Sequence, residues 1–225
     1  MRLHVQTLFR TDPHGRLLEM NDGSRAPAPR IFLGATEDGN EWWVRQDVGP
    51  ETVAELPKLI ERFPTVQEVA PNPAMQAALV EFAARTGEVN RIWSGPAYEC
   101  SKAPVEGPEP IRVSAENADC LAVYLPDWTA DAKAGVPMVA SIENGAAVAV
   151  CCSVRIGRSA QEAGVETHPD FRGRGHGKRV VAAWARVIRG MGQVPLYSTS
   201  WENRPSRALA ESLGLRCFGA DIHIS

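Results

Sequence analysis

The amino-acid sequence predicts an α+β protein in which helices cover a mixed β-sheet, and the signals are clearest in the second half of the chain. Two β-rich runs, residues 138–142 and 147–154, flank Asn144-Gly145. This dipeptide is the strongest short signal for a tight β-hairpin. A third β-rich run, residues 161–167, leads into a glycine-rich turn and then a helix.

The helix after the glycine-rich turn is amphipathic, and a further strand follows it. Its apolar face is formed by Val180, Val181, Trp184, Val187 and Ile188. Residues 195–199 have the composition of a strand, which should lie parallel to residues 161–167 through a right-handed crossover. Antiparallel hairpins joined to a parallel pair make the predicted sheet a mixed one.

The first hundred residues form a separate pattern of short strands and two helices. The expected elements are a strand at 3–9 that pairs with 16–20, a hairpin of 31–35 and 41–45 around Asp38-Gly39, a helix from Pro50 that Pro57 should kink or restart, a helix after Asn72-Pro73, and a strand at 90–93. Their Trp residues predict a packing domain. As a hypothesis, this domain also closes off a pocket of the other half.

A proline-rich segment at 99–110 is the best candidate for a linker. It predicts two domains, a smaller α/β domain at 1–107 and a second domain at 108–225. In the second domain we also expect a strand at 111–113, a helix at 115–124, and a short final pair of strands at 216–218 and 221–224.

Composition limits the classes of function. The 225 residues are 44% hydrophobic and 23% charged, which is typical of a globular protein. A net charge of −3 argues against a general binder of nucleic acid or membrane surfaces. The five cysteines show no metal-ligand spacing, and no segment is long enough to cross a bilayer. We therefore expect a cytoplasmic protein with reduced thiols and no metal site. The composition does not decide between a monomer and a homodimer.

The chemistry is concentrated in residues 165–178. Alternating glycines at 173, 175 and 177 leave main-chain N–H groups unshielded at the positive end of the helix dipole, which favours a phosphate or diphosphate ligand. A Walker loop is excluded by Arg172 and Arg179, and the dinucleotide fingerprint is excluded by Lys178. The pattern that fits is Arg/Gln-x-x-Gly-x-Gly/Ala, through Arg172, Gly175 and Gly177.

In this pattern the sequence resembles the GNAT superfamily of acyl-CoA-dependent N-acyltransferases. A second motif strengthens the resemblance, because Asn203 precedes a short helix that ends at Leu213-Gly214 before an apolar residue. The resemblance extends from about Ile111 to the C-terminus. It implies a GNAT-like domain in which two parallel strands splay apart, acetyl-CoA as the acyl donor, and an amine as the acceptor.

The resemblance also implies a set of coenzyme-binding residues. They are Val165, Glu166, Thr167, Arg172, Gly173, Arg174, Gly175, His176, Gly177, Lys178, Asn203 and Ser206. The first three match the segment whose backbone contacts pantetheine and the thioester, and residues 172–178 match the diphosphate loop. His176 is expected to act through its backbone rather than its ring.

Transfer to an amine needs a proton acceptor, and two carboxylates lie on the strand that enters the loop. Alternation places Glu162 and Glu166 on one face, and we prefer Glu166 as the catalytic base because it adjoins the expected thioester. A paired structural carboxylate is an equal alternative. The family's usual acidic tyrosine is replaced by Ala210, so Tyr197, Ser198, Thr199 and Ser206 are unranked candidates for the acid.

Two other functions compete with an N-acetyltransferase. A catalytically silent acyl-CoA sensor would explain Ala210. A nucleic-acid-binding module would use the cations Arg172, Arg174, Lys178, Arg179, Arg186 and Arg189, although a phosphate clamp plus a solvated helix face explains them more simply. The identity of the amine acceptor is not encoded in any motif.

Overall fold

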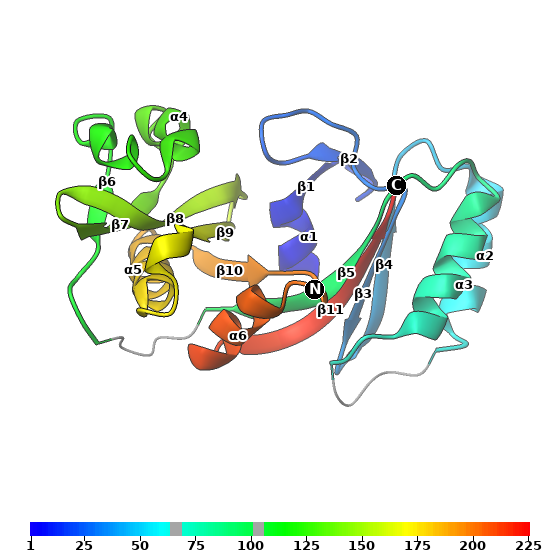
Figure 1. The fold of residues 1–225 in the computed structure, drawn as a ribbon. Helices are drawn as coiled ribbons and strands as arrows, with labels where there is room; N and C mark the ends of the chain where they lie inside the picture. Colours follow the sequence, from blue (N-terminus) through cyan, green and yellow to red (C-terminus); the bar gives the residue numbers. More distant parts are fainter. Residues whose placement is uncertain (64–68, 101–105) are drawn as a thin grey trace. The chain divides into compact units, whose positions relative to one another are not determined.

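The computed structural model describes residues 1–63, 69–100 and 106–225. The chain forms two compact units (Figure 1). Unit 1 consists of Met1–Tyr98, Ser198–Arg204 and Cys217–Ser225, and unit 2 of Glu99–Tyr197 and Pro205–Arg216. The units are therefore interleaved in the sequence, whereas we expected one boundary near residue 107. The last strand of the chain belongs to unit 1 because it pairs with a strand of the N-terminal hairpin.

Unit 1 contains a sheet with the strand order β4-β3-β11-β5. Its elements are α1 (Arg2–Leu8), β1 (Phe9–Thr11), β2 (Leu17–Met20), β3 (Ile31–Thr36), β4 (Gly39–Val44), α2 (Pro50–Ile60), α3 (Pro73–Ala84), β5 (Ile92–Glu99) and β11 (Arg216–Ile224). Helices α2 and α3 cover one face and α1 lies on the other (Figure 1). The apolar residues of β3 and β11 pack against α2 and α3, which makes the main core of this unit.

Most elements expected in unit 1 are present. The hairpin around Asp38-Gly39 is confirmed as β3 and β4, and residues 17–20 pair antiparallel with Phe9–Thr11. The helix after Asn72-Pro73 is confirmed as α3, whose Asn72 side chain accepts a hydrogen bond from Met75 N. Helix α2 is continuous through Pro57, so it does not restart there.

Two expectations for unit 1 are wrong. Residues 3–9 were expected as a strand, but α1 is a helix because helical spacing buries both Val5 and Leu8 beside Phe32. The expected final pair of strands is one continuous strand, β11. A Cβ at Gly219 would lie 2.5 Å from the Ala35 carbonyl oxygen, so this glycine permits a close approach of two strands rather than a turn.

Unit 2 contains the mixed sheet, with the strand order β10-β9-β8-β7-β6. Its elements are β6 (Ile111–Val113), the 3₁₀ helices η1 (Ala118–Leu121) and η2 (Pro126–Trp128), α4 (Thr129–Lys133), β7 (Met138–Glu143), β8 (Ala146–Ile156), β9 (Ala160–Thr167), η3 (Pro169–Phe171), α5 (His176–Gly190), β10 (Val194–Ser198) and α6 (Arg204–Ser212). β10 is parallel to β9, and the other pairs are antiparallel. The predicted α+β class with a mixed sheet is confirmed.

Both faces of this sheet are covered. Helix α5 packs on one face, where Trp184 Nε1 donates a hydrogen bond to Ser153 Oγ at 2.9 Å (Figure 1). The segment from η1 to α4 covers the other face through a core that includes Leu121 and Leu125. Among the described residues, no helix has both the length and the apolar composition needed to span a bilayer.

The hairpin at Asn144-Gly145 is confirmed, with φ of 50° and 82° at the two positions. The expected helix at 115–124 is wrong, because only η1 forms there. Asn117 explains the difference, since its side chain accepts from Ser114 N and donates to Arg112 O, which competes with helical pairing. The expected linker overlaps the end of β5 and lies partly outside the described residues.

A buried ionic cluster ties the two ends of unit 1 together. The carboxylate of Asp221 lies 2.7 Å from His4 Nε2 and 3.2 Å from His223 Nε2, and its side chain has no exposed surface. Burial raises the pKa of Asp221, but the charge and hydrogen bonds of His223 and His4 outweigh burial and lower it.

We expect Asp221→Asn to lower the free energy of unfolding by about 3 kcal/mol at neutral pH, because two histidines lose their buried partner. A lowered carboxyl pKa contributes stability above the pKa of the unfolded state, about 3.9. That contribution disappears as the pH falls through the folded-state pKa. Urea titrations at several pH values should therefore show the two proteins converging below about pH 4. A difference independent of pH would contradict this role of the charge.

Candidate active site

Strands β9 and β10 pair over a short distance and then separate. The parallel register joins Val194 to Ala160 and ends where Leu196 meets Glu162. β9 continues to Thr167 and stays paired with β8 on its other side. In the described part of unit 2, the main-chain groups of residues 163–167 that face away from β8 therefore have no partner on β10. An extended ligand that carries amides can pair with such an edge.

The loop that follows β9 presents a second row of main-chain donors. Gly173 and Gly175 have φ of 76° and 78°, a conformation that favours glycine. Within the described chain, the N–H groups of residues 173–178 have no backbone acceptor, and the first helical bond runs from Arg179 N to Gly175 O. Together with the dipole of the 15-residue α5, these donors favour an anion such as a diphosphate.

The structure brings the loop and the open strand edge together. Arg172 Nε donates to the carbonyl oxygen of Thr167 at 3.2 Å. A Cβ at Gly177 would lie 3.5 Å from Thr167 Oγ1, so the start of α5 rests against the end of β9. The end of β9 therefore lies against the loop and the start of α5, which carry the residues expected to bind coenzyme at 165–167 and 172–178.

The His176 ring is a buried anchor for this loop. Its Nδ1 lies 2.8 Å from both Ser141 Oγ and Arg179 Nη2, and its Nε2 lies 2.8 Å from Glu143 Oε1. A guanidinium group can only donate, so Nδ1 is the acceptor, whereas the approach of Nε2 to Glu143 lacks hydrogen-bond geometry. The imidazole therefore fastens the first residue of α5 to β7, a role that we did not assign to the ring from the sequence.

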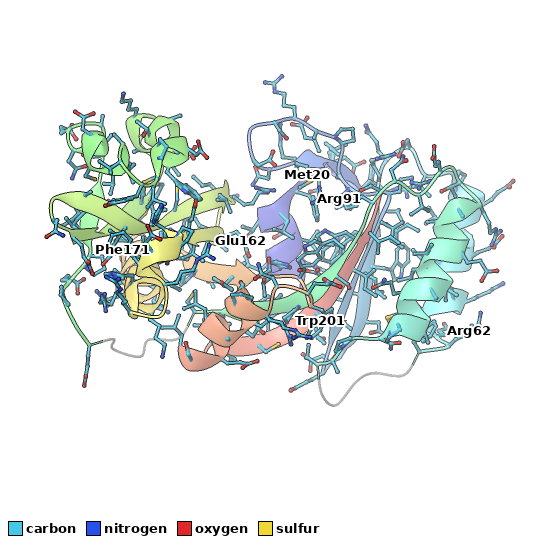
Figure 2. The ribbon with its side chains drawn as sticks, in the orientation of Figure 1. Met20, Arg62, Arg91, Glu162, Phe171 and Trp201 are labelled. Atoms are coloured by element: carbon cyan, nitrogen blue, oxygen red, sulfur yellow. The ribbon has the colours of Figure 1, made fainter. Side chains whose placement is uncertain are left out.

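The two carboxylates of β9 lie on one face but in different surroundings. Glu162 is only 4% exposed and sits where β9 and β10 separate (Figure 2), while Glu166 is exposed. Trp128 Nε1 donates to Glu166 Oε2 at 2.7 Å. A Cβ at Gly164 would lie 3.1 Å from the Trp128 ring and 2.3 Å from Val154, so this glycine makes room for both side chains.

Trp128 is a site residue that sequence reasoning missed. It lies 38 positions from Glu166 in the chain, and an isolated Trp after Pro126 carries no motif. Through this hydrogen bond, Trp128 fixes the orientation of the Glu166 carboxylate.

The second motif brings Tyr197 and Ser206 together. Tyr197 Oη and Ser206 Oγ are 2.6 Å apart, at the end of β10 and the start of α6. Burial, partly opposed by the bond to Ser206, raises the pKa of Tyr197 to about 12. Asn203 immediately precedes α6. Ala210, at the position of the family's tyrosine, is completely buried, and the described contacts give it no access to a ligand.

Most cations of the loop and helix are engaged within the chain. The contacts of the arginines are Arg172 with Thr167 O, Arg174 with Asp170 O and Glu143, Arg179 with Arg174 O and His176, Arg186 with Glu109, and Arg189 with Cys100 O. These side chains brace the loop and the helix rather than forming one free basic surface, which is why we do not pursue a nucleic-acid-binding module.

The comparisons with known proteins agree with this geometry. Residues 139–221 match the family described as FR47-like protein. A GNAT-family protein from Novosphingobium aromaticivorans is 19% identical, with a TM-score of 0.51, over 61% of this chain and 65% of that chain, just under two thirds of its length. A GNAT-family acetyltransferase from Colwellia psychrerythraea is 13% identical, with a TM-score of 0.52, over 85% and 80%. No curated protein sequence matches the chain significantly.

The chain thus has a fold similar to that of GNAT-family acetyltransferases, and its residues 139–221 match the FR47-like family. The fold implied by the resemblance of the two short motifs is confirmed. The identity to the solved structures is low, so they establish the fold and not the acceptor.

A substitution at Gly175 tests whether the loop needs its left-handed backbone conformation there. We expect Gly175→Ala to lower the free energy of unfolding by about 1–2 kcal/mol, because its φ of 78° strains an L-residue. The new Cβ would also lie 3.1 Å from Arg179 Nη1. Gly190→Ala, at the other end of α5 and in open space, is the matched control and should leave stability unchanged or raise it by up to about 1 kcal/mol. Equal effects in chemical denaturation would refute the special status of Gly175.

Proposed function

We propose that the protein is an N-acetyltransferase that transfers the acetyl group of acetyl-CoA to an amine by direct attack on the thioester. The observation that supports this most strongly is that β9 separates from β10 after Glu162 and then continues to Thr167, which contacts the loop of main-chain donors at residues 173–178. The open edge suits the amide-bearing pantetheine arm, and the loop suits the diphosphate.

Coenzyme A supplies an activated acyl group and a thiolate that can leave. The chain must then do three things: hold the donor, stabilise the oxyanion, and accept a proton from the amine. Main-chain N–H groups of residues 163–167 that do not pair with β10 can donate hydrogen bonds to the oxyanion. Such preorganised donors need no rearrangement during the reaction. The loop at 172–178 and Ser206, which belong to the same unit, bind the rest of the donor.

The carboxylates of β9 can accept the proton that the attacking amine loses. As the amine attacks the thioester carbon, its N–H proton passes to a carboxylate, directly or through water, while the C–S bond breaks. Glu166 is the better base, because it is exposed to an incoming amine and is held by Trp128. Glu162 is buried at the point where the strands part, and we assign it a supporting electrostatic role.

The departing thiolate does not need Tyr197 as a full acid. A thiol has a pKa of about 8.5, whereas burial raises the pKa of Tyr197 to about 12. Transfer of the phenolic proton to the thiolate is therefore unfavourable by roughly 5 kcal/mol. We propose that the sulfur leaves as the thiolate, assisted at most by a hydrogen bond from the Tyr197–Ser206 pair.

The function itself is tested by two measurements on the full chain. Isothermal titration calorimetry should show acetyl-CoA binding, and release of free thiol should depend on an added amine. Binding without thiol release over a broad amine panel would favour the second candidate, a silent acyl-CoA sensor. That candidate is supported by the buried Ala210 in place of the tyrosine. Absence of acetyl-CoA binding would refute both.

Glu166→Gln should lower kcat by about 100-fold at neutral pH, because the amide cannot accept the proton. Acetyl-CoA affinity should stay within about twofold, since only the main chain of residue 166 is proposed to contact the donor. The control Glu211→Gln makes the same charge change on the exposed part of α6 and should keep full activity. Unchanged turnover and an unchanged pH profile in the Glu166 variant would exclude it as the base.

Tyr197→Phe should lower kcat by less than about fivefold, because the phenol is too weak an acid to protonate the leaving group. Loss of its bond to Ser206 should cost about 1 kcal/mol of unfolding free energy. Steady-state kinetics with a fixed amine measures the change in kcat. A loss of 100-fold or more, with the alkaline limb of the pH profile abolished, would instead identify Tyr197 as the acid.

A further inference from the structure

Unit 1 contains a cavity whose lining includes none of the residues predicted to bind coenzyme. Its volume is about 210 Å³, and every residue that lines it belongs to unit 1. The cavity lies between the sheet and the start of α3, with Leu33, Ala35, Met75, Ala220 and Ile222 forming its apolar wall. Small residues at 35 and 220 leave space where the strand neighbours carry large side chains.

One wall of the cavity is made by the segment that follows β10. Trp201 N donates to Ser94 O at 3.1 Å, and both residues line the cavity. At the adjacent Gly95, a Cβ would lie 1.8 Å from the carbonyl oxygen of Thr199. Only glycine allows so close an approach, so Trp201 (Figure 2) is held against β5 by main-chain contacts.

The polar groups of the cavity are few and carry no positive charge. Ser94 Oγ donates to Gln76 Oε1 at 2.9 Å, which leaves the Ser94 oxygen as an acceptor. Glu202 is exposed at the rim, and within the described residues it forms no ion pair. The carboxylate of Asp221 is held by His4 and His223. No lysine, arginine or histidine is among the lining residues.

These features define the chemistry of a ligand. A cavity of about 150 Å³ with an apolar lining holds benzene, so about 210 Å³ has room for roughly eight non-hydrogen atoms. The apolar wall favours a hydrocarbon body. Glu202 and the indole of Trp201 favour an ammonium group at the rim and disfavour an anion.

We propose that this cavity is a binding site for a small amine with an aromatic or branched aliphatic body. The site is complete within unit 1 and needs no coenzyme. Its binding can therefore be measured without acetyl-CoA, and its failure would be distinct from failure of the proposed acetyltransferase activity.

The test is a ligand-observed NMR titration of the full chain with three probes of matched size: benzylamine, benzyl alcohol and benzoate. We expect benzylamine to bind at least tenfold more tightly than benzoate, with benzyl alcohol between them. Equal affinities for all three, or no saturable binding of benzylamine, would overturn the proposal.

Two variants locate the site. Ala220→Leu places a large side chain in the cavity and should abolish benzylamine binding, provided that its melting curve remains cooperative. Glu202→Gln changes only an exposed side chain and should reduce the preference for benzylamine over benzyl alcohol by at least threefold. Glu81→Gln, an equal charge change at an exposed position outside the cavity, should have no effect. Retained preference in Glu202→Gln, or retained binding in a folded Ala220→Leu, would overturn the proposal.

Discussion

Unpaired main-chain groups are the constraint on which the rest of unit 2 depends. A folded chain normally satisfies nearly all of its buried N–H and C=O groups within its own ladders and helices. Here β9 is no longer paired with β10 after Glu162, and six consecutive N–H groups at 173–178 have no backbone acceptor in the described chain. Such groups are stable only if water or a ligand completes them. A ligand with an amide-rich arm and a diphosphate at one end satisfies both sets at once.

The surrounding structure keeps those groups in place. The buried His176 ring joins the start of α5 to β7 through Ser141 and Glu143, while Arg179 reaches back to the carbonyl of Arg174. The long apolar face of α5 then secures the helix against the sheet, with Trp184 bonded to Ser153. The loop is therefore preorganised by side chains that need not touch the ligand themselves. This arrangement reduces the ordering cost of binding.

The sequence predicted those features that depend on local chemistry. Asn144-Gly145 specified a hairpin, and the alternating glycines before an amphipathic face specified the loop and α5, because both signals act within a few residues. The features that it did not predict depend on distant partners. α1 is a helix because Phe32 packs on it, β11 is continuous because Ala35 needs Gly219 beside it, and Trp128 meets Glu166 only after the sheet has formed. The cavity beside Trp201 likewise depends on residues from five separate segments.

The proposal that main-chain N–H groups bind coenzyme A is tested most directly by recording amide ¹H–¹⁵N spectra of the labelled full chain while coenzyme A is added. If the diphosphate is bound by main-chain donors, the amide protons of residues 173–178 should move downfield and saturate together, and those of 163–167 should follow with the same affinity. If coenzyme A binds while the amides of residues 173–178 stay unchanged, the diphosphate is held elsewhere. The separation of β9 and β10 would then not be the site of acyl transfer.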